Sequence, residues 1–303
     1  FKQKTAYEML RSLVGSEMCI RDRDYDVVVN IYPGVYNVSS TLVVTSTHIK
    51  AIRGMAKEGA IIRPTADLVS SPGPIFDISF ITSTDFGLRL LTIDGSQTTG
   101  FKDTAGCTAI KISSGGTRWM DIGEIIIKDV NVAINMEVAN LVNVSGINIY
   151  RIGDTVFKLD NGASLELINS YVEDAENRYV WIKSTTGSTT FYMVNSEFGS
   201  LSDLGTGIYI EDNASYAELR NSNLWGLNYN IRSFDSSTVL VTSGFLQRSA
   251  TLNIEQNDNS KISIVNSSGD FSSTDLDIEN PTNFYLSVFN INEKSLVMGS
   301  GAY

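Results

Sequence analysis

Short stretches of alternating apolar and polar residues recur along the chain from about residue 140 onwards. In each repeat an alternating stretch leads to Asn or Ser, then to a small residue, and then to a second short alternating stretch before a polar turn. The small residues of successive repeats are spaced by 26, 26 and 22 residues, and they are Ser170, Ser196, Ser222 and Gly244. Alternation predicts β-strands, and strands this closely spaced leave no room for long crossover helices. The pattern therefore predicts a solenoid in which each turn of chain stacks on the previous one.

The same column of small residues continues upstream with wider spacing. Gly146 stands 24 residues before Ser170, whereas Gly54, Gly87 and Gly123 are separated by 33 and 36 residues. The wider gaps indicate that loops have been inserted into the early repeats, chiefly at 55–60 and 95–106. Counting repeats over the whole chain gives about ten coils.

Near its start the chain contains a segment with the form of a first coil. Val28–Ser39 (VVNIYPGVYNVS) places a Pro-Gly turn between two short strands. With the coil length, this segment resembles the right-handed parallel β-helix of pectate-lyase-like enzymes and phage tailspikes, over about residues 25–298. The resemblance implies an all-β, single-stranded right-handed parallel β-helix over residues 24–303, and a homotrimer if the protein works as tailspikes do. Because this fold hosts many unrelated activities, it does not decide the function.

Asparagine precedes the small residue in most repeats, at Asn169, Asn195, Asn221 and Asn266. We expect these side chains to point inward at a bend and to stack from coil to coil. Such a ladder of hydrogen-bonded amides satisfies polar groups that would otherwise be unpaired. These asparagines are therefore interpreted as structural.

Residues 1–23 do not follow the repeat. They start without Met and lack the apolar core and the small-residue cleavage site of a signal peptide. Ser16–Arg23 (SEMCIRDR) resembles translated sequencing-adapter read-through, so we interpret residues 1–23 as an artefact. The alternative is a short amphipathic helix over Ala6–Val14 that caps the end of the fold.

Composition excludes several classes of function. A formal net charge of -11 with 23 Lys and Arg residues argues against a nucleic-acid partner, because such partners are bound largely through basic side chains. Two cysteines and the single histidine, His48, are too few for a disulfide framework or a zinc site. No apolar run approaches the ~20 residues of a membrane span, so we expect no membrane insertion. Any chemistry must rely on carboxylates, Tyr, Lys, Arg or an oxygen-liganded cation such as calcium.

Strand alternation assigns the side chains after the small residue to two sides of a sheet. The second residue after it is mainly apolar and should face the core: Ile125, Asn148, Val172, Phe198, Leu224 and Leu246. The neighbouring positions then face solvent, which places five candidate side chains on one exposed sheet: Tyr171, Glu173, Glu197, Asn223 and Trp225. Exposed aromatic rings beside carboxylates and amides are typical of a sugar-binding surface.

Two of these carboxylates form a candidate catalytic pair. Glu173 and Glu197 are one coil and two strand positions apart, so their Cβ atoms should be about 8 Å apart. Inverting glycosidases hold their two carboxyl groups ~6.5–9.5 Å apart. The alternatives are a binding groove without catalysis and a solvated acidic surface.

A second pair, Asp85 and Asp121, precedes the glycines of TDFG and MDIG. We expect the two side chains to face outward on adjacent coils, about 5 Å apart. Carboxylates that close repel each other unless they bind a cation such as calcium, share a proton or meet a retaining-glycosidase substrate. The inserted loops at 95–106 and 113–117 would wall a cleft beside them and bring Asp94 and Asp103 to it. The alternative is a solvated surface.

Known enzyme motifs of this fold are missing. The Asn-Thr-Asp, paired-Asp and Gly-His-Gly motifs of polygalacturonase-like hydrolases do not occur. A pectate-lyase-like mechanism needs calcium-binding Asp residues beside an Arg or Lys base. Arg118 and Lys128, near Asp121 and Asp129, are the nearest candidates, but their surroundings do not match that family's motifs. The negative charge of the protein would also repel a polyuronate.

The leading hypothesis is a phage tailspike-like or tail-fibre-like protein, extracellular or on a virion surface, that binds a cell-surface polysaccharide, with or without cleaving it. The competing hypothesis is a secreted bacterial polysaccharide lyase or glycoside hydrolase that uses one of the two carboxylate pairs. A third is a non-catalytic adhesin or structural stalk, in which the repeats supply rigid length.

Overall fold

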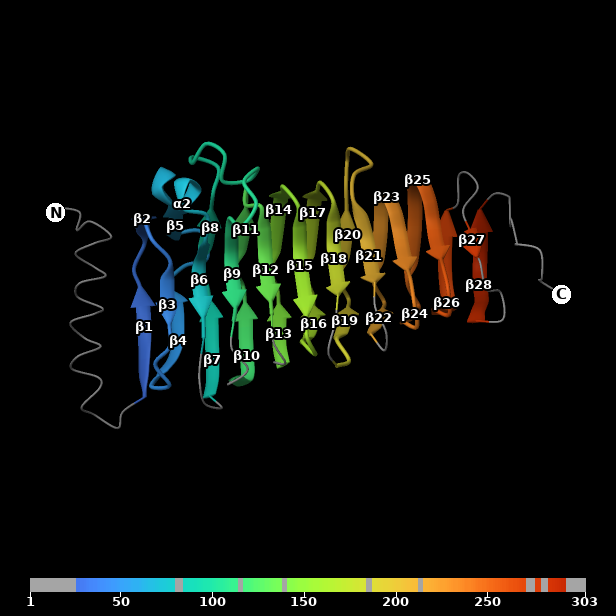
Figure 1. Ribbon diagram of the computed structural model, residues 1–303, viewed down its shortest axis with the longest axis horizontal. Helices are drawn as coiled ribbons and strands as arrows, with labels where there is room; N and C mark the ends of the chain where they lie inside the picture. Colours follow the sequence, from blue (N-terminus) through green and yellow to red (C-terminus); the bar gives the residue numbers. More distant parts are fainter. Residues whose placement is uncertain are drawn as a thin grey trace.

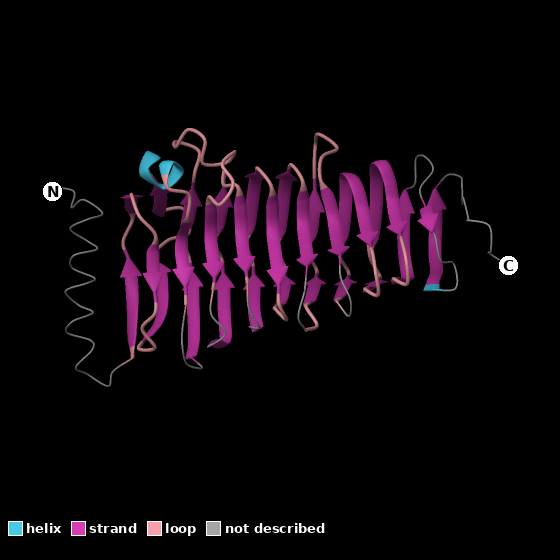
Figure 2. Cartoon of the chain, viewed as in Figure 1, coloured by secondary structure: helices cyan, strands magenta, loops and turns pink. Residues whose placement is uncertain are grey.

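The chain winds as an elongated parallel β-solenoid of about ten coils (Figures 1 and 2). The computed structural model describes residues 26–79, 84–113, 117–137, 141–183, 187–211, 215–270, 276–278 and 283–292. In most coils a strand pairs in parallel with the strand three places further along the chain, one coil away. This confirms the predicted all-β parallel solenoid, while its right-handed winding stays a prediction. The two interpretations of residues 1–23 concern a segment outside the described residues.

Each coil contributes to three faces, which we number in chain order. The first face consists of β1 (Val27–Ile31), β4 (Ile49–Gly54), β7 (Thr84–Arg89), β10 (Thr117–Gly123), β13 (Leu141–Ser145), β16 (Ser164–Ile168), β19 (Thr190–Val194), β22 (Tyr216–Arg220), β24 (Thr238–Thr242) and the first halves of β26 (Lys261–Asp270) and β28 (Phe284–Asn292).

The second face follows directly after one corner. It consists of β2 (Gly34–Val38), β5 (Ala60–Pro64), β8 (Thr92–Asp94), β11 (Ile126–Lys128), β14 (Asn148–Ile152), β17 (Tyr171–Ala175), β20 (Glu197–Gly199), the first parts of β23 (Asn223–Ser233) and β25 (Phe245–Gln256), and the second halves of β26 and β28.

The third face returns the chain to the next coil. It consists of β3 (Leu42–Val44), β6 (Pro74–Ile78), β9 (Thr108–Ile112), β12 (Val132–Met136), β15 (Thr155–Asp160), β18 (Arg178–Lys183), β21 (Thr206–Glu211), the second parts of β23 and β25, and β27 (Leu276–Ile278).

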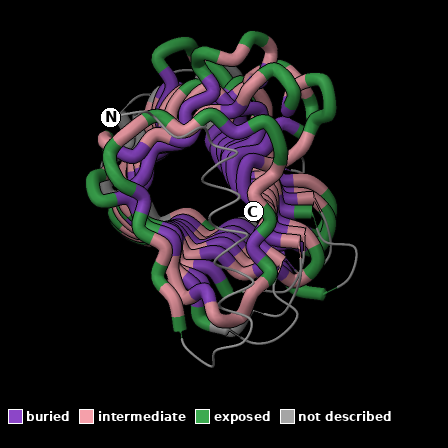
Figure 3. The backbone as a smooth tube through the Cα atoms, turned by 90° about the vertical axis from the view of Figure 1, so that its left-hand side faces the viewer, coloured by how far each residue is buried: buried purple, intermediate pink, exposed green. Residues whose placement is uncertain are grey.

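The core lies inside the ring of strands, where every second side chain of each face points. Viewed along the axis, buried residues line the inside of the coils and exposed residues lie at the corners (Figure 3). Aliphatic side chains fill most of the interior, and the aromatic rings of Phe157, Phe191 and Phe198 pack together with centroids 6.1–6.3 Å apart. Among the described residues no helix is long and apolar enough to cross a membrane.

Serine, and not asparagine, forms the inward ladder at the corner between the first and second faces. Ser196 donates from its hydroxyl to the carbonyl of Val194 (2.9 Å) and accepts from the backbone N–H of Ser170 (3.0 Å). Ser170 and Ser222 repeat the arrangement one coil to either side. The prediction of inward-pointing asparagines is wrong: Asn169, Asn195, Asn221 and Asn266 are exposed, with φ of +48° to +50°. Asparagine suits this corner because it tolerates the left-handed conformation.

The upstream part of the predicted column is also out of register. Gly146 has φ +59° and occupies the left-handed corner position itself, in line with Asn169. The strand that follows is therefore shifted by one residue. Ile147 and Ile149 are buried, whereas Asn148, predicted to lie in the core, faces outward. From Ser170 onward the predicted inward and outward positions are confirmed.

Insertions gather over the early coils. The short helix α2 (Ala66–Ser70) precedes β6, and the loop 95–107 lies beside it (Figure 1). Phe101 is fully buried in this loop, the Asn131 side-chain amide donates to the carbonyl of Lys102 (2.9 Å), and Lys102 pairs with Glu176 (2.5 Å). The loop therefore packs along several coils and does not stand free in solvent. Part of the other predicted loop, at 113–117, lies outside the described residues.

Candidate functional site

The second face carries the predicted candidate residues in two outward columns. The first column runs Asn148, Tyr171, Glu197 and Asn223, and the second runs Tyr150, Glu173, Gly199 and Trp225. Strand pairing thus brings together all five residues that the sequence placed on this surface. Tyr150 joins them because of the shifted register after Gly146.

Trp225 lies down across its own sheet. A Cβ added at Gly199 would overlap three atoms of the Trp225 indole, so the ring occupies the space that the glycine leaves open. The indole N–H donates to the Oε1 atom of Glu197. One side chain therefore spans two columns, and the nitrogen-bearing edge of the indole is held against the sheet, over Gly199 and beside Glu197.

Tyr171 and Tyr150 extend this surface over the preceding coils. Their ring centroids are 6.2 Å apart and the ring planes are tilted by 53°. Burial raises the pKa of Tyr171 to about 12, and the charges of Glu173 and Glu197 and a hydrogen bond to Glu173 contribute to this increase. Burial and the charge of Glu173 also raise the pKa of Tyr150. Both phenols are therefore neutral hydrogen-bonding groups at physiological pH, in an acidic setting.

Glu173 and Glu197 lie on adjacent strands and on a diagonal, as the sequence predicts. The spacing of strands and residues gives a Cβ separation of about 8 Å. Trp225 already occupies one oxygen of Glu197, which holds that carboxylate in place as a hydrogen-bond acceptor. The pair remains a catalytic hypothesis, and the arrangement equally suits two acceptors for ligand hydroxyls.

The predicted pairing of Asp85 with Asp121 is wrong. Asp85 lies opposite Trp119, and Asp121 lies opposite Gly87, so the two aspartates are offset by two positions. Asp121 instead forms an ion pair with Arg89, and Asp85 is exposed. The misalignment has a simple cause: Gly87 and Gly123 are not equivalent positions, because Gly123 pairs with Arg89.

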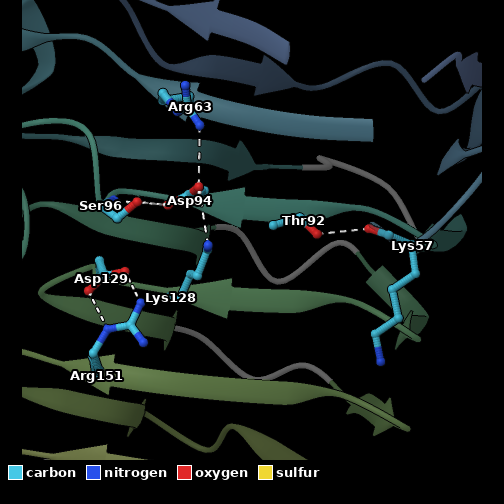
Figure 4. Close-up of polar contacts among 8 residues, drawn as sticks. All are labelled: Lys57, Arg63, Thr92, Asp94, Ser96, Lys128, Asp129 and Arg151. Carbon is cyan, nitrogen blue, oxygen red and sulfur yellow. Dashed lines mark hydrogen bonds and ion pairs between the residues drawn. The ribbon is translucent and has the colours of Figure 1, made fainter. Parts of the chain in front are cut away.

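Asp94 is a buried carboxylate whose oxygens contact other side chains of the protein. It is 5% exposed, and it contacts Arg63 (3.4 Å), Lys128 (3.3 Å) and both the hydroxyl and the backbone N–H of Ser96 (Figure 4). Burial alone would raise the pKa of Asp94, but hydrogen bonds from Ser96 and the charge of Lys128 outweigh it and lower the pKa. Asp103 is exposed on the loop 95–107.

No metal site is assembled in the part of the chain that the structure describes. There, no group of three or more His, Cys, Asp or Glu side chains is arranged to hold an ion. The calcium expectation therefore has no residues to which we can assign it.

The first face carries a hollow that the sequence analysis did not predict. It is lined by Leu141, Glu166, Tyr192, Val194, Glu218 and Arg220. Glu218 is 6% exposed and accepts from the hydroxyl of Tyr216 (2.9 Å) and from Nε of Arg220 (2.5 Å). Its signal in the sequence was the column Glu166, Tyr192, Glu218, which repeats every 26 residues. This column lies before the small residue, on the first face, and not among the columns after it.

The third face carries a further aromatic surface, around Trp181, whose rings are covered by neighbouring Lys and Arg side chains. Lys158, Arg178 and Lys183 lie 4.4–5.7 Å from the ring centre of Trp181. The indole N–H of Trp181 donates to Glu211 (3.0 Å). The Trp181 ring and the charges around it therefore interact with each other, through cation–π contacts and a hydrogen bond within the protein.

Comparison with known proteins identifies the fold and leaves the family open. No family model and no curated protein matches the sequence. Among solved structures, the A-module of mannuronan C-5 epimerase AlgE4 from Azotobacter vinelandii is similar with a TM-score of 0.53 and 12% identity, over 88% of this chain and 86% of that one. The Streptococcus pneumoniae surface protein and adhesin PfbA aligns with a TM-score of 0.40 and 10% identity, over 87% of this chain and 90% of that one. At these identities, the epimerase module supports the fold alone.

Proposed function

We propose that this protein binds a polysaccharide through the second face of its solenoid, in the region formed by Tyr171, Glu173, Glu197 and Trp225. One observation carries the proposal: the Trp225 indole lies along the sheet over Gly199, fixed by Glu197. An indole held over the sheet in this way offers an aromatic surface on which a sugar ring can stack, and the two carboxylates beside it accept hydrogen bonds from sugar hydroxyls.

Charge narrows the class of polysaccharide. No Lys or Arg forms an ion pair with Glu173 or Glu197 among the described residues, and the whole chain has a net charge of -11. An anionic polymer would be repelled from this surface, so the proposed ligand is an uncharged polysaccharide. The similar epimerase module is named for an action on mannuronan, a polyanion. We therefore carry over its fold and not its substrate.

The experiment measures binding to immobilised dextran, yeast mannan and galactan, with alginate and polygalacturonate as anionic counterparts. We expect retention on at least one neutral polymer, and a loss of about tenfold or more in affinity for Trp225→Ala. Trp181→Ala on the third face is the matched control and should retain binding. Equal binding by wild type and Trp225→Ala, or retention on the anionic polymers alone, would contradict the proposal.

Cleavage at the same surface is a second candidate, supported by the diagonal placement of Glu173 and Glu197. If these carboxylates act as general acid and base, wild type should release reducing ends from the bound polymer. Glu173→Gln and Glu197→Gln should then abolish the release while leaving retention largely intact. Retention without release by wild type would restrict the protein to binding.

A polysaccharide-binding solenoid of this kind fits a tailspike-like or tail-fibre-like surface protein, extracellular or on a virion, and we propose that role with a trimeric assembly. Its support is the resemblance of the first coil and the coil length to that group of proteins. Native mass spectrometry of the full chain tests the assembly. A monomer that cleaves its polymer would favour the secreted enzyme, and a protein that neither binds nor cleaves would favour a stalk.

A further inference from the structure

The hollow on the first face and the Trp225 region on the second face are separated by a single corner. Val194 and Arg220 line the hollow, and each is the last residue of its strand. Three residues further along, Glu197 and Asn223 open the second face. The hollow draws on four successive coils, from β13 to β22, and three of these coils also carry the Trp225 region, so the two surfaces adjoin each other around one edge of the solenoid.

The corner between them is lined by exposed amides. Asn169, Asn195 and Asn221 occupy one position on successive coils, each with φ +48° and each exposed. Their backbone N–H groups bond to the next coil. None of the three side-chain amides has a hydrogen-bonding partner among the described residues, so the amides are available to a ligand.

The hollow itself has the chemistry of a site for an uncharged sugar. Tyr192, Val194 and Leu141 give it an apolar lining, and the ring of Tyr216 lies 5.8 Å from that of Tyr192. Glu166 supplies an acceptor on one side. On the other side Arg220, whose side chain is 60% exposed, uses its Nε to hold Glu218 and so keeps terminal N–H donors for a ligand. An apolar floor with an acceptor and a donor at its ends complements the apolar face and hydroxyls of a sugar ring.

We infer that one polysaccharide chain crosses this corner, with sugar units in the first-face hollow, along the corner amides and on the Trp225 indole. The inference rests on the proposed function and adds a second subsite and a direction, across the coils' shared edge instead of along the solenoid axis. From Tyr192 to Gly199 the backbone path is about 23 Å at full extension. A short oligosaccharide would fill one subsite, and only a longer one would reach both.

The test compares affinity with chain length, using size-fractionated ladders of dextran, mannan and galactan oligosaccharides from disaccharide to decasaccharide. For wild type we expect affinity to rise by about a hundredfold between the shortest and longest members, because the second subsite is engaged within the same molecule. Tyr192→Ala should remove most of this rise while leaving the affinity for disaccharides unchanged. Asn195→Gly, which keeps the left-handed backbone, should reduce the affinity for long members about threefold.

Tyr285→Ala is the matched control, because Tyr285 is 59% exposed on the same face but lies beyond the hollow. It should behave as wild type. If Tyr192→Ala and Tyr285→Ala give the same length dependence as wild type, the crossing path is overturned while binding at Trp225 stands. If Trp225→Ala leaves the affinity for every ladder member unchanged, or no ladder binds, the proposed function fails first.

Discussion

One outward column of the second face changes character halfway along the solenoid. In its early coils Arg63, Asp94 and Lys128 are stacked neighbours, and the buried carboxylate is held between two cations. From Tyr150 onward the same column continues with Glu173, Gly199 and Trp225. Here a carboxylate stands beside aromatic rings without an ion pair to Lys or Arg among the described residues.

The difference teaches how to distinguish a structural polar column from the proposed binding surface on the same sheet. The carboxylate oxygens of Asp94 already accept hydrogen bonds and ion pairs from Ser96, Arg63 and Lys128, which leaves few acceptor positions for a ligand. Glu173 lies opposite Gly199, and the Trp225 indole occupies the space over that glycine. The Glu173 carboxylate and the indole therefore share one surface. The boundary at Tyr150 marks where the internally compensated half ends.

The largest effect should come from breaking the compensated half. Asp94→Asn leaves Arg63 and Lys128 without their carboxylate, so we expect a loss of about 3 kcal/mol in the free energy of unfolding at pH 7. Because the folded pKa of Asp94 is lowered, its contribution is present above the unfolded pKa and is lost as the pH falls through the folded value. Urea denaturation should therefore show the variant and wild type converging below about pH 4. Asp103→Asn, at an exposed loop position, should change stability by less than about 0.5 kcal/mol.

The next largest effect should appear in the other half. Gly199→Ala places a methyl group where the Trp225 indole lies, so the ring must leave the sheet surface. We expect about tenfold weaker polysaccharide binding, or about 1.4 kcal/mol, with little change in unfolding. Gly87→Ala is the control, since its added Cβ would find its nearest neighbour at 3.7 Å. Unchanged tryptophan fluorescence and unchanged binding in Gly199→Ala would show that the indole is not the platform.

A smaller effect should separate the two cations that hold Asp94. Lys128→Met removes one partner while Arg63 remains, and the Lys128 side chain is 30% exposed. We expect a loss of about 1 kcal/mol, measured by thermal or urea unfolding. Lys261→Met, at an exposed position of the first face, should be neutral. A loss as large as that of Asp94→Asn would mean that Lys128 alone compensates the carboxylate.

The smallest effect should be a shift in titration. Glu173→Gln removes a negative charge and a charged hydrogen-bond acceptor beside Tyr171, so the pKa of that phenol should fall from about 12 towards its ordinary value of 10. Carbon NMR of labelled tyrosine follows this directly. Glu166→Gln, on the first face, should leave the pKa of Tyr171 unchanged. No shift in Glu173→Gln would remove Glu173 from the acidic surroundings that we assign to the binding half.

The repeat pattern was sufficient to predict the fold and the later half of the candidate site. Alternation fixes which side chains point outward once the corner is located, and in three successive coils an asparagine, Asn169, Asn195 or Asn221, occupies the left-handed corner position directly before a serine. Upstream the corner residue itself varies: Leu90, Glu124 and Gly146 all occupy the left-handed position there. Aligning the early coils by their small residues therefore gave the wrong register, which placed Asp85 opposite Asp121.

Side-chain direction beyond the strand was not predictable from spacing. Trp225 could have pointed to solvent, and only the absence of a side chain at Gly199 lets the indole lie back across the sheet. Likewise Asp94 appeared as one candidate among several acidic residues. Its partners Arg63 and Lys128 come from neighbouring coils and are brought to it only by the register of β5, β8 and β11.

The serine ladder also makes the coil a unit of length that can be added or removed. Ser170, Ser196 and Ser222 are 26 residues apart, and each contributes the same donor and acceptor to its neighbours. A duplicated or deleted segment of that size would join ends that carry the same serine hydrogen bonds, with no unpaired hydroxyl where they meet. Such a change would also lengthen or shorten the row of amides, aromatic rings and carboxylates by one step. Evolution by whole coils would thus widen or narrow the surface that these side chains present without redesigning the core.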